Sequence, residues 1–79
     1  MAEESSMQRL IRLLEAELSR KFPSGVQITS LARQCGTSSM KLHQVAAGLN
    51  IMSEGRISPG NAAKIAAHYA VEAQASAST

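Results

Sequence analysis

The sequence predicts an all-α fold, namely a four-helix helix-turn-helix domain with a small two-stranded wing before the last helix. Three observations predict it. Apolar residues recur at helical spacing in four stretches, capping and stop residues separate these stretches, and a glycine stands between the second and third. A chain of 79 residues holds one domain at most. We expect a disordered N-terminus over 1–5, the domain over 6–73 and a disordered tail over 74–79.

The first helix is predicted from about residue 6 to 21, with a signal at each end. Ser5 and Gln8 have capping-box spacing, and Pro23 ends the helix because proline cannot continue it. Its apolar stripe consists of Met7, Leu10, Ile11, Leu14, Leu18 and Phe22. Leu13 lies off that stripe and widens the apolar arc, which predicts a homodimer through helix 6–21. The alternative is that the whole arc covers the helices at 30–47 of the same chain.

A short strand or bridge and a second helix are predicted next. Residues 26–28 alternate apolar, polar, apolar, as a strand does. Thr29 is the expected N-cap of a helix through Cys35. Gly36 is expected to end this helix, because glycine readily adopts the left-handed conformation of a tight turn between helices.

The third helix is predicted to begin at a cap on Thr37 or Ser38, to run to about residue 47 and to end at Gly48. Residues 50–58 are predicted as a hairpin turning at Glu54–Gly55, with an irregular loop as the alternative.

Ser58 followed by Pro59 marks the start of the last helix, because serine is a good cap and proline fits the first helical position. The apolar face of this helix is expected to consist of Ala62, Ile65, Ala66, Tyr69 and Ala73.

The spacing within the second and third helices is typical of a pair that packs closely across a tight turn. Such a pair needs a small residue on the inner side of the first helix, a glycine in the turn and apolar residues that lock the helices together. Counted from Ile28 as position one, the matching residues are Leu31 at four, Ala32 at five, Cys35 at eight, Gly36 at nine, Leu42 at fifteen and Val45 at eighteen. This pattern favours a helix-turn-helix that presents its second helix to DNA.

Charge and exposure suggest the contacts. Net charge is +2, but residues 18–71 carry six Lys and Arg against Glu54 alone, so the middle of the chain is basic. If Leu42, Val45 and Ala46 face the core, polar residues of the third helix face outward and can bond phosphates and base edges. The predicted DNA-binding residues are Ser38, Ser39, Lys41, His43 and Gln44, with Arg33, Arg56 and Lys64 on phosphates. An ordinary solvent-facing helix has a similar composition.

The stretch "VQITSLARQCGTSSMKLHQVAAGLNIMSEGRISPGNAAKIAAHY" has a V-x-I start, an L-A-x-x-x-G helix, a second helix ending in G-L, a short wing and a further helix. Over residues 26–69 it resembles the small winged-helix domains of excisionases and MerR-type regulators, which implies a DNA-binding transcriptional regulator or mobile-element accessory factor. Its L-A-x-x-x-x-T-S-x-x-x-L layout also resembles the N-terminal module of bacterial translation initiation factor two. That resemblance implies the alternative, a protein- or RNA-docking adaptor.

Other chemistry has little support in the sequence. We expect no enzymatic activity, because no paired acids, glycine-rich phosphate loop or nucleophile–base arrangement occurs. Cys35, His43 and His68 are too few and too scattered for a zinc site, so we expect no metal or cofactor. No small-molecule substrate or membrane partner is expected, and the single cysteine fits a cytoplasmic location. A purely structural oligomerisation domain is a third possibility.

Overall fold

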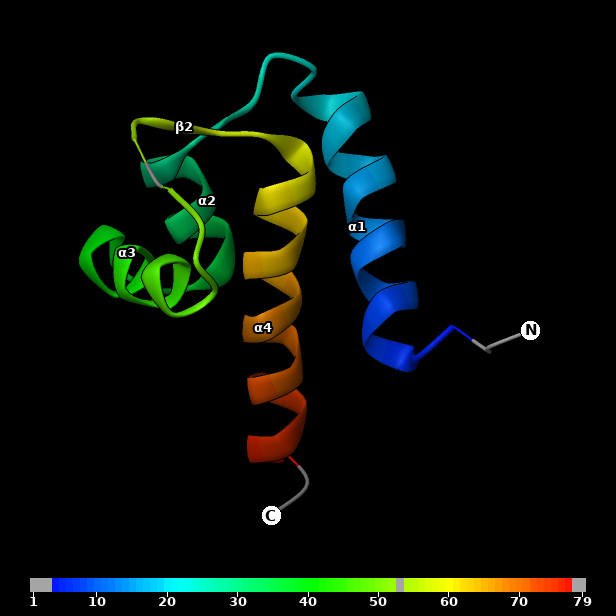
Figure 1. The fold of residues 1–79 in the computed structure, drawn as a ribbon. Coiled ribbons are helices and arrows are strands. Elements are labelled where there is room, and N and C mark those ends of the chain that lie inside the picture. The colour runs from blue at the N-terminus through cyan, green and yellow to red at the C-terminus, as the bar shows by residue number, and fades with distance from the viewer. Residues whose placement is uncertain (1–3, 53, 78–79) are drawn as a thin grey trace.

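A computed structural model describes residues 4–52 and 54–77, and the side chains of these residues through Val71. The described part is mostly helical and includes a two-stranded antiparallel sheet (Figure 1), as the predicted all-α fold with a small sheet requires. The elements are α1 (Ser6–Lys21), β1 (Val26–Gln27), α2 (Ile28–Cys35), α3 (Ser39–Gly48), β2 (Arg56–Ile57) and α4 (Pro59–Ala77).

The predicted limits and caps of α1 are confirmed. The Ser5 hydroxyl accepts from the Gln8 amide at 3.1 Å, and the Gln8 side chain accepts from the Ser5 amide at 3.1 Å. The helix ends before Phe22, whose amide donates to the Leu18 carbonyl at 2.7 Å. The sequence predicts a disordered terminus over 1–5, but Ser5 is the N-cap of α1. Residues 1–3 lie outside the described part.

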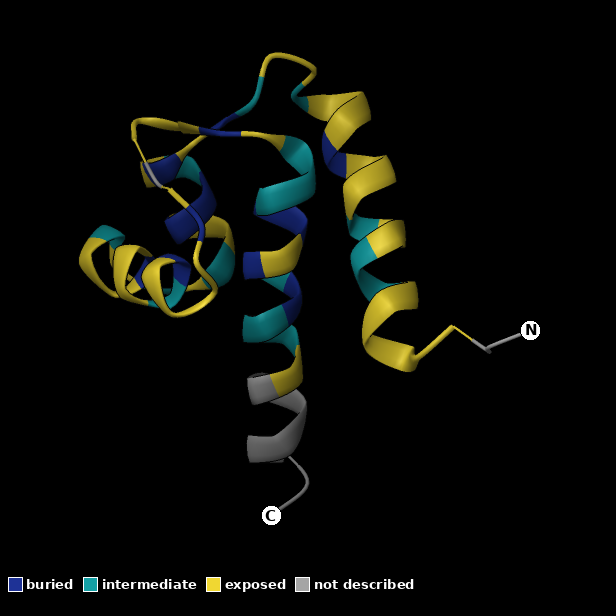
Figure 2. Cartoon of the chain, viewed as in Figure 1, coloured by how far each residue is buried: buried dark blue, intermediate teal, exposed yellow. Residues whose placement is uncertain are grey.

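Helices α1 and α4 run antiparallel, and α4 lies between α1 and the α2–α3 pair (Figure 1). Leu18 is buried, and Ile11, Leu14 and Phe22 pack against the core as predicted. The sequence predicts Met7 on the same apolar stripe, but its side chain is exposed. It belongs to the first turn of α1, which projects beyond the buried part of the helix pair (Figure 2).

Helix α4 is buried more widely than predicted. Ala62 and Ile65 are buried, and Ala66 and Tyr69 are partly buried, but Ala63 and Ala67 are also fully buried. The reason is its central position, since a helix that contacts neighbours on two sides buries two faces. Small alanine side chains allow such close contacts. The side chain of Ala73 lies outside the described residues, and the α4 backbone continues to Ala77, beyond the predicted domain limit.

The sheet joins residues distant in sequence, so the local hairpin predicted over 50–58 is wrong. Val26 pairs with Ile57 and Gln27 with Arg56. The chain turns at Gly55 (φ +70°), where the Arg56 amide donates to the Glu54 carbonyl at 2.6 Å. Val26 and Ile57 are both buried, so their contact in the core outweighs the local pairing of Ile51 with Ile57.

Two helix ends also differ from the prediction. Thr29 is not the cap of α2, because the helix begins at Ile28, whose amide donates to the Gly55 carbonyl at 2.9 Å. The hydrogen bond to the Gly55 carbonyl therefore satisfies the Ile28 amide, so this amide needs no side-chain cap. Gly48 is the last residue of α3 rather than the left-handed residue that follows the helix, and Asn50 supplies that conformation at φ +59°.

The start of α4 is as predicted, with the Asn61 amide donating to the Ser58 hydroxyl at 3.4 Å. Within the described residues, no helix has both the length and the apolar character needed to cross a bilayer.

Candidate nucleic-acid interface

The turn between α2 and α3 fixes how α3 is displayed. Gly36 ends α2 in the left-handed conformation at φ +71°, as predicted, and its amide donates to the Arg33 carbonyl at 3.1 Å. The Thr37 amide donates to the Ala32 carbonyl at 2.9 Å. Of the two expected caps, Ser38 is the one used, and its hydroxyl accepts from the Lys41 amide at 3.2 Å. Hydrogen bonds thus hold the turn at both of its ends.

Helix α3 has one buried and one exposed side, divided as predicted. Leu42 and Ala46 are fully buried, and Val45 packs against the same core. The exposed residues are Met40, Lys41, His43, Gln44, Ala47 and Gly48. Residues spaced by three and four positions share a face of a helix, so the outer side carries both polar and apolar groups. Ser38 is exposed, whereas Ser39 is partly buried and offers less of its surface to a partner.

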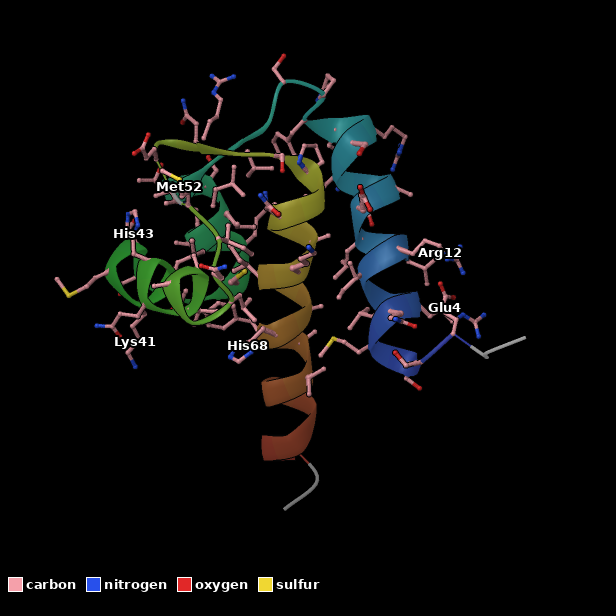
Figure 3. The ribbon with its side chains drawn as sticks, in the orientation of Figure 1. Glu4, Arg12, Lys41, His43, Met52 and His68 are labelled. Carbon is pink, nitrogen blue, oxygen red and sulfur yellow. The ribbon has the colours of Figure 1, made fainter. Side chains whose placement is uncertain are left out.

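Lys41 and Gln44 meet residues of α4 in an open hollow of about 420 Å³. The hollow is also lined by Gly36, Thr37, Val45, His68 and Tyr69. The side chains of Lys41 and His68 lie on the same side of α3 (Figure 3), and the adjacent His68 and Tyr69 rings are perpendicular with centroids 5.8 Å apart. One flank of α3 therefore places a cation and an amide beside two rings of α4.

The opposite flank of α3 differs. His43 projects away from Lys41, on the side of α3 where Met52 lies (Figure 3). Met52 is 79% exposed, in the segment that leads from α3 toward β2. The predicted contacts Lys41 and His43 thus belong to opposite edges of the same exposed surface.

The three predicted phosphate contacts outside α3 lie on separate elements, namely Arg33 on α2, Arg56 on β2 and Lys64 on α4. All three are exposed. Arg56 lies beside Gly25 and lines two surface hollows, one of which includes Thr29. Among the described residues, the hollow that contains Lys41 is lined by none of these three. The predicted contacts therefore do not all lie in one site.

Charge pairing separates α1 from the rest of the molecule. Arg12 pairs with Glu4 at 3.0 Å and Lys21 with Glu17 at 3.1 Å. The hydrogen bond from Arg12 lowers the pKa of Glu4, and that same bond raises the pKa of Arg12. Among the described residues, Arg33, Lys41, Arg56 and Lys64 form no salt bridge, which leaves their charges available to an anionic partner.

Cys35 is a partly buried core residue rather than a reactive thiol. It packs beside the core, and burial raises its pKa, which keeps it protonated at neutral pH. In the described part of the chain, no three His, Cys, Asp or Glu side chains form a group that would hold a metal ion.

Sequence reasoning missed three residues beside the predicted contacts. His68 and Tyr69 line the hollow with Lys41, and Met52 lies near the opposite flank. His68 follows Lys64 by four positions, and this spacing places the two on one face of α4. Nothing in the sequence around Met52 indicates its position, because the loop between α3 and β2 has no regular period.

Comparisons of the chain with protein-family models, with curated proteins and with solved structures each gave no match. The function is therefore argued from the geometry and chemistry of the surface around α3.

Proposed function

We propose that the protein binds double-stranded DNA, with α2 and α3 acting as a helix-turn-helix and α3 entering the major groove. The observation that carries this proposal is the position of α3, which is fixed by its buried side and exposes the other side to solvent. A tight turn centred on Gly36 holds the helix, one side is anchored in the core, and the other side is exposed and contains no acidic residue. A small transcriptional regulator or mobile-element accessory factor would use such a surface.

Each predicted contact has a role that fits its position. Gln44 can pair with an adenine edge, and Lys41 can bind a guanine edge or a phosphate. The Ser38 hydroxyl accepts the cap bond, and its own proton can still be donated to a phosphate. Ser39 and His43 add polar groups to the same helix, while Arg33, Arg56 and Lys64 supply positive charge from its neighbours.

A salt titration of binding to random-sequence duplex DNA tests this proposal. Each phosphate that a cation neutralises releases counterions, so affinity should fall steeply with salt. The double variant Lys41→Ala/Gln44→Ala should weaken binding at least about tenfold and make the salt dependence shallower by about one phosphate contact. Both side chains are exposed, so the melting temperature should stay nearly unchanged.

The matched control is Lys21→Ala/Ser24→Ala, which removes one cation and one polar group from exposed positions at the end of α1 and just after it, away from Leu13. It should bind as the unmodified protein does. Wild-type affinity in the Lys41→Ala/Gln44→Ala variant would show that α3 is not the contact surface.

A second candidate function is docking to a protein or RNA, as in the adaptor alternative. Its support is the exposure of two methionines, Met40 at 72% and Met52 at 79%, because flexible thioether side chains suit adaptable apolar contacts. Binding to a protein through these groups would change little with salt, whereas nucleic-acid binding would weaken. Competition between duplex DNA and RNA of the same length separates the remaining alternatives.

The proposed DNA-binding form is a homodimer through α1, which would present two copies of α3 to half-sites about one helical turn apart. Leu13 supports this, because it is 53% exposed on the outer side of α1. Sedimentation equilibrium should give twice the chain mass of 8.4 kDa, and Leu13→Glu should return it to the single-chain value. A single-chain mass at all micromolar concentrations would exclude the dimer.

A further inference from the structure

The middle of the exposed side of α3 is a row of three residues, Met40, Gln44 and Ala47. Their spacing of four and three positions places them one above another on the helix surface. All three are exposed, and Met40 is 72% exposed. The row is about 10 Å long at the helical rise per residue, which matches roughly three base-pair steps. Helical spacing places Lys41 on one side of this row and His43 on the other.

The chemistry of this row differs from that of a guanine-reading helix. The commonest guanine contact is a bidentate Arg or Lys, and the row contains neither. An amide such as that of Gln44 matches the N6 and N7 edge of adenine. Apolar side chains on either side of it match the one apolar group in the major groove, the C5 methyl of thymine.

We infer that the row formed by Met40, Gln44 and Ala47 reads A·T base pairs, with Met40 and Ala47 contacting thymine methyl groups and Gln44 contacting an adjacent adenine. This inference rests on the proposed DNA binding. It also accounts for a methionine that is 72% exposed on the outer side of α3. Lys41 lines the same hollow as Gln44, but it follows Met40 by one position, and helical spacing places it to one side of the row. It then serves the backbone rather than the base edges.

Replacement of thymine by uracil tests the inference, because it removes the C5 methyl group and keeps the charge and the base pairing. Two duplex pools of the same random sequences are prepared, one with thymine and one with uracil throughout. The unmodified protein should bind the thymine pool at least threefold more tightly. Met40→Ser/Ala47→Ser should bind both pools equally, and circular dichroism should show that this variant remains folded, since both positions are exposed.

Met7→Ser is the matched control, because Met7 is an exposed methionine on α1, remote from α3. It should keep the preference for thymine. Equal binding of both pools by the unmodified protein, with a steep salt dependence, would overturn the inference and leave the proposed function standing. Failure to bind either pool at low salt would overturn both. A thymine preference that persists in Met40→Ser/Ala47→Ser would overturn the assignment to this row.

Discussion

Helices α1 and α3 each bury one side against the core, but their outer sides have different chemistry. The outer side of α1 carries charges of both signs, and Glu17–Lys21 and Glu4–Arg12 form ion pairs there. Helix α3 has no acidic residue, and its outer side combines one cation with a thioether, an imidazole, an amide and a methyl group. The same burial pattern therefore leaves two very different surfaces.

This difference means that exposure alone does not identify a contact surface. Two cations of the α1 surface, Arg12 and Lys21, have carboxylate partners in their own chain. The cations around α3 have no carboxylate partner among the described residues, as the DNA-binding proposal requires. The difference in function requires that α3 is held rigidly by its buried side.

The largest expected effect on stability comes from replacing Leu42, the residue that anchors α3 in the core. Leu42 is fully buried, so Leu42→Ala should lower the free energy of unfolding by about 2–5 kcal/mol. A domain of this size has about 3–5 kcal/mol in total, so urea titration at 25 °C should show that a large part or all of this stability is lost. Met7→Ala, at an exposed position in the first turn of α1, should cost less than about 0.5 kcal/mol. Similar losses in the two variants would mean that α3 is not anchored through Leu42.

The next effect concerns the turn that orients α3. No atom lies within 4 Å of the position that a Cβ on Gly36 would occupy, so a side chain there is opposed by the backbone conformation alone. Gly36→Val should therefore cost about 1–3 kcal/mol, and Gly36→Asn clearly less, because asparagine tolerates the left-handed region.

Gly48 provides a control of opposite sign for Gly36. It is the last residue of α3, has no left-handed φ and lies in open space, so Gly48→Ala should stabilise the protein by up to about 0.5–1 kcal/mol. Equal melting temperatures for Gly36→Val and the unmodified protein would show that the turn adopts another conformation in solution.

The parts of the fold that the sequence predicted depend on neighbouring residues. The capping box at Ser5, the turn at Gly36 and the start of α4 at Ser58 each result from contacts within a few positions. The same holds for the two sides of α3, because a helical period determines which residues share a face. Local signals of this kind can be read from one sequence.

Most of the errors involve partners far away in the chain. The sequence around Glu54–Gly55 allows a hairpin, yet Ile57 pairs with Val26 because both are buried in the same core. Ala63 and Ala67 are buried because α4 has neighbours on two sides, which no periodicity reveals. For the candidate site, the exposed residues of α3 were predictable, but the meeting of Lys41 with His68 and Tyr69 depends on how α4 packs.

Tyr69 lies where α4 packs against both α1 and α3. It lines the hollow beside Lys41 and a second pocket that includes Leu14 of α1, and within the described residues its buried hydroxyl has no hydrogen-bond partner. An unpaired buried hydroxyl is unfavourable, so Tyr69→Phe should leave the unfolding free energy unchanged or raise it by up to about 1 kcal/mol. A loss of more than about 1 kcal/mol in urea titrations would indicate that the hydroxyl is hydrogen-bonded in solution.

The smallest effect concerns the outer side of α1, where Arg12 lowers the pKa of Glu4. A carboxyl whose pKa is lower in the folded protein stabilises the fold above its unfolded pKa, and this contribution disappears as the pH falls through the folded value. Both groups are exposed, so salt should screen the effect and the melting temperature at neutral pH should change little in Arg12→Ala.

The sensitive readout for this pair is the Glu4 pKa itself, measured by NMR titration of the side-chain carboxyl. It should rise toward the ordinary value in Arg12→Ala and stay low in Arg20→Ala, which removes a cation of the same helix that is not its partner. If Arg12→Ala left the Glu4 pKa low, the charges of α1 would not be matched by their own chain. The contrast with α3 would then rest on the apolar groups of its outer side alone.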